Sequence, residues 1–443
     1  MKKLIVFAAA LTMLALLSCA RTDTIDPHST DHVDTTASDH AQGLTYEEAQ
    51  QIAEKIFTPS AEGASAANDD VVYRRWNTTL EYSVTTLTDD SGVSHLYVMY
   101  SSAGKEPVML CTDEECDHMD MRCTAFAGRG VVSLVAQNGK NETVVYYTTG
   151  MESTINIGGQ TVALDGVKWE RASSSMAIFE YNLDTGARRC VVSRLRTMLL
   201  LPEIYYNGRL YAYQTFDCPL YSIDVVTGEY TQVESENYLR PIGAYDKRVY
   251  FFGENGTLYS SNEDLSDMIT VEEFGDSGAA NPLVASMGGN NFYFIADEQY
   301  ETDSEGNKTG SARCDLCKYD VSDPSAEAEI IAERVDGNRF EIYGNYVYYT
   351  KYDPHSYGYY GAIEIASKTG GTLYRYDALT GKTETVFEDC GGDVEVIYYI
   401  DNEKIVFTGD YYGGLADGYQ YVDENDIYKT FIYHFALNDL MVQ

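Results

Sequence analysis

The sequence has 443 residues, of which 31 are Lys or Arg and 69 are Asp or Glu, so its formal net charge is −38. A surface this acidic repels nucleic acid and anionic lipid headgroups, which excludes charge-driven binding to either. The charge keeps the protein soluble, and it can also attract cations or basic partners.

The first residues, "MKKLIVFAAALTMLALLSCA", have the features of a lipoprotein leader. Two lysines precede the apolar run Leu4–Leu17, which is too short to span the ~30 Å core of a bilayer and therefore predicts a secretory signal. The phrase "LLSC", ending at Cys19, resembles the lipobox of bacterial lipoproteins. The resemblance implies a signal peptide over residues 1–18, a diacylglyceryl anchor on Cys19 and an extracytoplasmic location at the cell membrane. The alternative is an ordinary signal peptide with a chance cysteine.

The next two segments are a predicted tether and a predicted helix. Residues 19–43 are polar and cannot bury a core, so we expect a flexible, lipidated tether. Residues 44–70 are predicted to form a helix, Leu44–Phe57, followed by a linker. Thr45 and Glu48 fit a capping box at the start of this helix. We expect the helix to pack on the body or to lead off the lipid tether.

Residues 71–443 alternate short runs of Tyr, Val, Ile and Phe with Gly, Asn and Asp, which is typical of strands and turns. One phrase recurs as "FEYNLDTG" from residue 179, "LYSIDVVTG" from 220 and "LYRYDALTG" from 373. A second phrase, such as "YNGRLYAY" from residue 206, precedes the first one. Each unit predicts an antiparallel meander, and repeated meanders predict an all-β fold, a β-propeller of about seven blades. Six or eight blades are the alternatives.

The repeated phrases also resemble the repeats of quinoprotein-like and related propellers. Asp184, Asp224 and Asp377 recur at the turn of this phrase. We therefore predict that these carboxylates cap turns and have no catalytic role.

The last two long loops, residues 351–371 and 409–430, are rich in Tyr, Gly and acidic residues. Long loops on a rigid scaffold commonly carry function, and two further ones are expected at 150–175 and 297–313. The tyrosines can form an aromatic platform for a sugar, a peptide or a cation, or they can pack within their own loops. The candidate ligand-binding residues are Tyr352, His355, Tyr357, Tyr359, Tyr360, Tyr411, Tyr412, Tyr419 and Tyr421.

Three cysteines and a histidine lie close together in "LCTDEECDHMDMRC", residues 110–123, in the pattern Cys-x4-Cys-x-His-x4-Cys. Cys111, Cys116, His118 and Cys123 form a competent tetrahedral set for a structural zinc ion, and the acidic residues between them favour a cation. A disulfide such as Cys116–Cys123 and a reactive thiol are the alternatives. In each case we expect the segment to staple a loop, because four protein ligands leave no open position for catalysis.

The longer phrase "VMLCTDEECDHMDMRCTAF" resembles a segment found near the start of surface lipoproteins of clostridia-like bacteria. Those proteins combine a lipobox, a spacer and weak propeller repeats. The resemblance implies the architecture and implies no activity.

A second cysteine motif, Cys314 and Cys317 in "ARCDLCKYD", lies within a predicted strand. Residues three apart in a strand point to opposite faces of the sheet. This spacing argues against a redox or zinc hairpin and favours core packing or separate disulfides.

The sequence contains no G-x-S-x-G, H-E-x-x-H, P-loop or EF-hand motif, and it indicates no catalytic residue. The first hypothesis is a lipid-anchored propeller that binds a glycan, a peptide or an envelope protein outside the cell. The second is a propeller enzyme, a glycan hydrolase or lyase, at the cell surface, since fold alone does not exclude one. The third is a structural or sensory ectodomain of an envelope complex.

Overall fold

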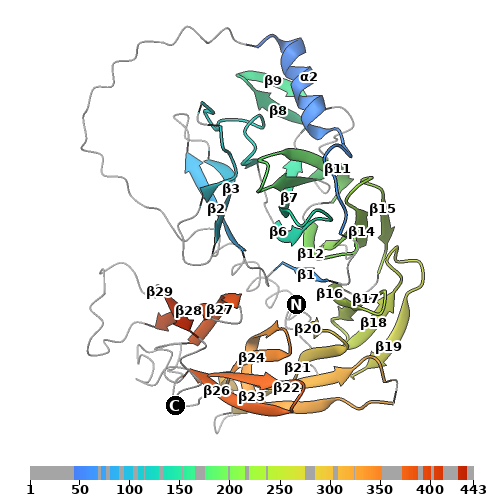
Figure 1. Ribbon diagram of the computed structural model, residues 1–443, viewed down its shortest axis with the longest axis vertical. Coiled ribbons are helices and arrows are strands. Elements are labelled where there is room, and N and C mark those ends of the chain that lie inside the picture. Colours follow the sequence, from blue (N-terminus) through green and yellow to red (C-terminus); the bar gives the residue numbers. More distant parts are fainter. Residues whose placement is uncertain are drawn as a thin grey trace.

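The computed structural model describes one helix and a series of antiparallel strands (Figure 1). The predicted all-β class with one helix near the N-terminus is therefore confirmed for the described residues. No helix among them has the length and apolarity needed to cross a membrane. The described residues are 44–67, 71–75, 80–88, 94–102, 108–113, 115–128, 133–151, 153–164, 175–197, 200–214, 219–235, 238–274, 285–302, 308–323, 325–351, 372–387, 393–400, 404–412 and 428–436.

One helix near the N-terminus precedes all the described strands. In chain order they are α2 (Tyr46–Phe57), β1 (Tyr73–Arg74), β2 (Leu80–Thr88), β3 (Ser94–Ser102), β4 (Val108–Met109), β5 (Phe126–Gly128), β6 (Ser133–Gln137), β7 (Thr143–Met151), β8 (Thr154–Ile157), β9 (Gln160–Ala163), β10 (Ser175–Asn182), β11 (Arg188–Arg196), β12 (Leu200–Tyr206), β13 (Arg209–Gln214), β14 (Leu220–Asp224), β15 (Tyr230–Val233), β16 (Leu239–Tyr245), β17 (Arg248–Gly253), β18 (Thr257–Ser261), β19 (Ile269–Glu273), β20 (Ala285–Gly288), β21 (Asn291–Thr302), β22 (Lys308–Asp320), β23 (Glu329–Tyr343), β24 (Tyr346–Lys351), β25 (Leu373–Asp377), β26 (Lys382–Phe387), β27 (Asp393–Ile400), β28 (Lys404–Tyr412) and β29 (Tyr428–Ala436).

Consecutive stretches of chain form consecutive sheets, as repeated meanders require. The sheets are β2–β3–β4 with β5 on β3, then β6–β7–β10–β11, then β12–β13–β14–β15 with β1 on β12, then β16–β17–β18–β19, then β20 to β26, and last β27–β28–β29. Figure 1 shows these sheets following one another around the molecule, with β1 near its middle.

The seven-stranded sheet β20 to β26 contains two meanders joined through one long strand. The first part of β23 pairs with β22, from Glu329 to Asp336. The last part pairs with β24, from Phe340 to Tyr343, after a register shift that follows Val335. β23 is therefore the last strand of one meander and the first strand of the next.

The core consists of hydrophobic clusters that lie between consecutive sheets. In β7, Val145 and Tyr147 face the first sheet and α2, whereas Val144 and Tyr146 face the sheet that begins with β12. Two more clusters lie between the later sheets, and another lies between the two meanders of the sheet β20 to β26. A sheet that buries both faces against its neighbours produces strands that are apolar on both sides, which explains the long tyrosine-rich runs of this sequence.

The helix α2 packs on the body, as one of the two alternatives predicted. Its capping box is formed, because the backbone N–H of Glu48 donates to Thr45 Oγ1 over 3.3 Å and that of Thr45 donates to Glu48 Oε2 over 2.9 Å. Ala49, Ala53 and Phe57 form its buried face, which lies against β8, β9 and β11. The apolar stripe thus decides where the helix docks.

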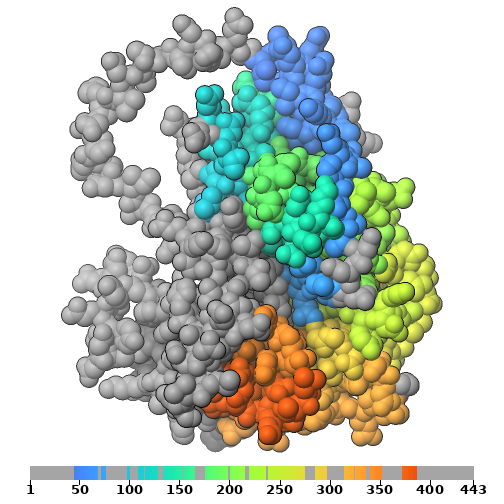
Figure 2. Space-filling view, in the orientation of Figure 1, coloured from blue at the N-terminus to red at the C-terminus, as the bar shows by residue number. Residues whose placement is uncertain are grey.

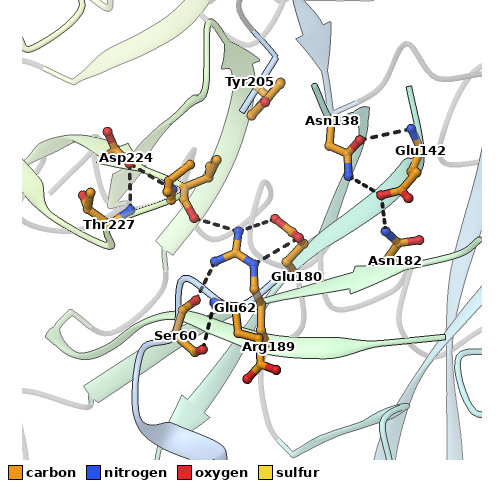
Figure 3. Close-up of polar contacts among 12 residues, drawn as sticks. Ser60, Glu62, Asn138, Glu142, Glu180, Asn182, Arg189, Tyr205, Asp224 and Thr227 are labelled. Carbon is orange, nitrogen blue, oxygen red and sulfur yellow. Dashed lines mark hydrogen bonds and ion pairs between the residues drawn. The ribbon is translucent and has the colours of Figure 1, made fainter. Parts of the chain in front are cut away.

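Arg189 fixes the linker that follows α2 to two sheets (Figure 3). Its guanidinium pairs with Glu180 at 2.5 Å and donates to the carbonyl oxygens of Ser60 over 3.0 Å and Val225 over 2.7 Å. In Figure 2 the blue N-terminal segment continues from the helix across the face of the green sheets toward the yellow and orange strands. The linker is therefore an ordered strap across consecutive sheets.

The repeated aspartates cap turns at two of the three predicted positions. Asp224 Oδ1 accepts from the backbone N–H of Val226 and of Thr227, and Asp377 Oδ1 accepts from Leu379. In the first repeat Asn182 holds this position, and its Oδ1 accepts from the N–H groups of Asp184 and Thr185. The prediction is wrong for Asp184, which lies two residues later and accepts from the N–H of Thr143 over 2.7 Å.

Two of the expected long loops contain regular structure. Residues 150–175 include the hairpin β8–β9, because "INIGGQTV" alternates apolar residues around a Gly158-Gly159 turn and Ile157 and Val162 are buried under α2. In the second, residues 297–313, β21 and β22 extend beyond the sheet as a paired ribbon. The prediction of plain loops was wrong at both places.

Candidate metal centre

The cysteine-rich segment interrupts the third strand of the first sheet. β4 and β5 both pair with β3, and residues 110–125 leave the sheet between them. The carbonyl oxygen of Val98 accepts from the N–H of Leu110 over 3.1 Å, and the N–H of Val98 donates to Ala125 over 2.9 Å. Both ends of the loop are thus held by one residue of β3, which fixes where the loop begins and ends.

The four predicted ligands lie together at the centre of this loop. One side-chain ligand atom from each of Cys111, Cys116, His118 and Cys123 lies within 4.8 Å of all the others, and His118 Nδ1 lies 3.2 Å from Cys123 Sγ. Tetrahedral zinc, with bonds of about 2.3 Å to sulfur and about 2.0 Å to nitrogen, separates its ligands by roughly 3.4–3.8 Å. The cluster therefore has the composition and spacing of a zinc site.

The structure shows no disulfide between Cys116 and Cys123, which was the alternative to a metal site. All six described cysteines, including Cys116 and Cys123, are free thiols. Bridging this pair would remove two of the four ligands, so a disulfide and a metal exclude each other here.

Cys116 and His118 are separated by one residue, and the backbone conformation explains how both side chains can face the same point. His118 has a φ of 57°, in the left-handed region that non-glycine residues seldom adopt. Its carbonyl oxygen accepts from the hydroxyl of Tyr97 in β3. A turn precedes Cys116 and another precedes Cys123, because the backbone N–H of each donates to a carbonyl oxygen three residues earlier.

The electrostatics of the three thiols favour a cation between them. Burial raises the pKa of Cys123 to about 12; the N–H of Ala125 opposes the rise, and the charges of Cys111 and Cys116 add to it. Burial also raises the pKa of Cys116. Burial opposes ionisation of Cys111 as well, but hydrogen bonds from the Asp113 backbone and the Thr124 hydroxyl outweigh it and lower the pKa. Three neighbouring thiolates repel one another, and a divalent cation removes that cost.

Two further residues hold the loop in place, and sequence reasoning did not single them out. Asp120 is 5% exposed and accepts from the N–H of Gly158 in the β8–β9 turn over 2.6 Å. Arg188 of β11 donates to the carbonyl oxygens of Met121 and Cys123, over 2.6 and 2.7 Å. Asp120 was visible only as one acid among several, and Arg188 lies 65 positions beyond Cys123 in sequence, so tertiary structure alone brings them together.

The loop shares one hydrophobic core with the structure around it. Leu110, Met121 and Cys123 belong to the same buried cluster as Phe57 of α2 and Ile157 of β8. A metal ion here would fix the helix, the hairpin and the first two sheets relative to the loop. Since four protein ligands fill a tetrahedral zinc ion, the arrangement supports a structural centre and leaves no position for substrate.

The second cysteine motif places its two thiols in different parts of the core. Cys314 and Cys317 of β22 are both buried, but they belong to hydrophobic clusters on opposite faces of their sheet. The prediction of core packing at both cysteines is confirmed.

The predicted aromatic platform lies largely outside the described residues. Tyr411 and Tyr412 end β28, where they pair with Lys429 and Tyr428 of β29, and their side chains are not described. Cys19 also lies outside the described residues. The remaining members of the platform, equally outside, are Tyr352, His355, Tyr357, Tyr359, Tyr360, Tyr419 and Tyr421.

No protein-family model matches this sequence, and no curated protein sequence does. Among solved structures, a *Pyrococcus horikoshii* acylaminoacyl peptidase aligns with a TM-score of 0.43 at 10% identity over 84% of this chain and 53% of its own. An oligogalacturonate lyase in complex with manganese gives 0.36 at 12% identity over 75% and 95%. TolB from Acinetobacter baumannii gives 0.29 at 10% identity over 69% and 79%. This chain spans about half the length of the peptidase, and likeness at this level assigns neither activity nor ligand.

Proposed function

We propose that this chain is a lipid-anchored, extracytoplasmic β-propeller that binds a glycan, a peptide or an envelope protein. The observation that carries the proposal is the series of five hydrophobic clusters, four between consecutive sheets and one between the two meanders of the sheet β20 to β26. A rigid scaffold of this kind, without a catalytic motif and with a saturated metal site, suits recognition better than chemistry.

The propeller is a closed ring in this proposal. If β23 is divided between two meanders, the described sheets give seven units, and this count supports a seven-bladed ring. The first strands of neighbouring units contact each other from β6 through β12 and β16 to β20, and β27 contacts β2 at the other end of the chain. The contact between β27 and β2 is the one that would close the ring.

A zinc ion held by Cys111, Cys116, His118 and Cys123 stabilises the first blade. Its support is the complete ligand set and the absence of disulfides among the described cysteines. The ion would supply no chemistry beyond cross-linking, because all four positions are occupied by protein.

The membrane anchor is the diacylglyceryl group on Cys19. A Cys19→Ala variant expressed in a bacterial host should lose the mass of the acyl chains and keep its leader, because Cys19 is both the lipidated residue and part of the cleavage signal. A wild-type protein that carries no acyl chains on Cys19 would contradict the lipoprotein assignment.

The binding function is tested with the purified full-length lipoprotein in detergent. The purified protein is applied to a glycan array. In a separate experiment, the lipoprotein is cross-linked to neighbouring envelope proteins in intact cells, and the captured partner is identified. In parallel, soluble glycans are incubated with the protein and their reducing ends are counted. Saturable binding without turnover supports the proposal, whereas turnover would favour the alternative, a glycan hydrolase or lyase.

A further inference from the structure

A pocket of 470 Å³ lies where β1 meets three consecutive sheets, which contain β12, β16 and β20 to β26. The ends of four strands form its wall, with Tyr206 from β12, Tyr245 from β16, Met287 from β20 and Ile342 from β23. β1 contributes Arg74. Figure 1 shows β1 close to β12, β16 and β20, near the middle of the molecule. Its size is that of pockets that take small organic ligands.

Arg74 is the one basic residue among those lining this pocket. Its Nε is sealed from solvent and has no hydrogen-bond partner. The structure shows no hydrogen bond or ion pair from its guanidinium to any residue in the described ranges. Arg75, the next residue, is by contrast paired with Glu203 at 3.0 Å. A sealed Nε without a hydrogen-bond partner on a half-buried guanidinium is costly, and an anion bound in the pocket would offset that cost.

A second arginine lies near Arg74 although the chain carries a charge of −38. Arg240 pairs with the same carboxylate of Glu203 as Arg75 does, at 3.2 Å. Burial lowers the pKa of Arg74 to about 10, Glu341 opposes the decrease, and Arg240 adds to it. The guanidinium still carries its charge at neutral pH, and an anion in the pocket would relieve both the burial and the repulsion from Arg240.

The mouth of the pocket is open, and its walls combine polar and apolar surface. Gly289 and Gly344 have φ angles of +61° and +57°, and a Cβ added to either would meet no atom within 4 Å. Val72 lines the pocket together with the methionine, isoleucine and tyrosine side chains named above. Asp246, which is exposed, is the only carboxylate among the lining residues.

We propose that this pocket binds a monocarboxylate with an apolar or aromatic body, whose carboxylate pairs with Arg74. A guanidinium binds a carboxylate through two parallel hydrogen bonds. One positive charge matches one negative charge, whereas Asp246 and Glu341 would repel a phosphate dianion. The ligand is either a free organic acid or the C-terminal residue of a peptide. This inference names a ligand class for the proposed binding function and rests on it.

The test is titration calorimetry on the full-length lipoprotein in detergent. The probes are N-acetylphenylalanine and its amide, which differ only in the carboxylate. The acid should bind saturably and the amide at least tenfold more weakly, and inorganic phosphate should not compete. The tripeptide Ala-Ala-Phe, with a free or an amidated C-terminus, distinguishes the two sources, because a peptide-binding pocket prefers the free tripeptide to the acetylated amino acid.

Variants decide whether Arg74 is responsible. Arg74→Gln should weaken binding of the acid at least tenfold, while Arg196→Gln, which removes the same charge at an exposed position of β11, should leave it unchanged. Asp246→Asn should strengthen binding about twofold to fivefold by removing the repulsive carboxylate. Its turn tolerates the change, since Asn readily adopts the positive φ of 49° found there.

Stability without ligand gives a readout that a structural arginine would not. Removing an unpaired buried cation should keep or raise the melting temperature of Arg74→Gln, whereas removing a structural arginine lowers it. If Arg74→Gln fails to fold, the Asp246→Asn titration still decides. The proposal would be wrong if the lipoprotein bound neither N-acetylphenylalanine nor the free tripeptide, or bound the amide equally well. It would also be wrong if either variant left the affinity for the acid unchanged. Capture of an envelope partner by that same protein would leave the binding function standing.

Discussion

Both cysteine motifs of this chain contain closely spaced cysteines, but the fold gathers the cysteines of the first motif and separates those of the second. Cys111, Cys116 and Cys123 lie in a loop that leaves the sheet, where turns and a left-handed His118 bring their sulfur atoms to one point. Cys314 and Cys317 lie in a regular strand, and the pleat sends them into two different cores. The number and spacing of cysteines therefore predict a site only once the backbone that carries them is known.

Cys116, which is only partly buried, gives the strongest test of the difference between the two cysteine motifs. Cys116→Ser should abolish zinc binding and lower the free energy of unfolding by about 4 kcal/mol or more, because loss of a structural metal is among the largest single-residue effects. Elemental analysis of the purified protein and urea unfolding would measure both. A variant that retained its metal, or kept the wild-type midpoint, would show that the cluster is no zinc site. Removal of metal by a chelator from the wild type should reproduce the loss.

Arg188 tests whether the loop depends on the neighbouring sheet. Arg188→Met should cost roughly 2–3 kcal/mol and weaken zinc binding about tenfold, because two carbonyl oxygens of the loop lose a charged donor and Phe179 loses a cation at 5.2 Å from its ring. Competition with a calibrated chelator measures the affinity. Arg196→Met, on the same strand but exposed, serves as the control. Equal effects of the two variants would separate the loop from β11.

The strand motif supplies the opposite expectation. Cys317→Ser and Cys314→Ser should each cost about 1–2 kcal/mol, because a hydroxyl replaces a thiol in an apolar cluster. Neither should change the zinc content. If either variant lost metal while remaining folded, the separation of the two motifs would be wrong.

The smallest effect concerns a turn that belongs to neither motif. Hydrogen bonds from the Thr380 hydroxyl and the Leu379 backbone lower the pKa of Asp377 below its ordinary value of 3.8. Since the folded form has the lower pKa, the contribution of this carboxylate is complete above pH 3.8 and is lost as the pH falls through the folded value. Asp377→Asn should flatten the acid limb of a plot of melting temperature against pH. An unchanged acid limb would show that the turn cap contributes nothing that titrates.

Sequence reasoning identified the four residues of the Cys/His cluster and the helix with its cap, because both depend on residues a few positions apart. It identified the turn aspartates correctly at Asp224 and Asp377. It missed Asn182, because the first repeat also contains Asp184, two residues later, which was taken for the capping residue. It took residues 150–175 for a loop, although the alternation around Gly158-Gly159 is typical of a hairpin.

The tertiary structure decided what the repeats could not. Arg74 stands in a two-residue strand, and nothing in "VVYRRWN" distinguishes it from Arg75; only the pairing of β1 with β12 separates an unpaired arginine from an ion-paired one. In the same way Arg188 and Asp120 acquire their roles from contacts across sheets. The sequence by itself determined the strand-rich meanders, the helix and the zinc-type ligand set, because propensity, capping and ligand chemistry act over short separations. The partners of buried charges depend on which distant strands pack together, and that is decided only when the sheets assemble.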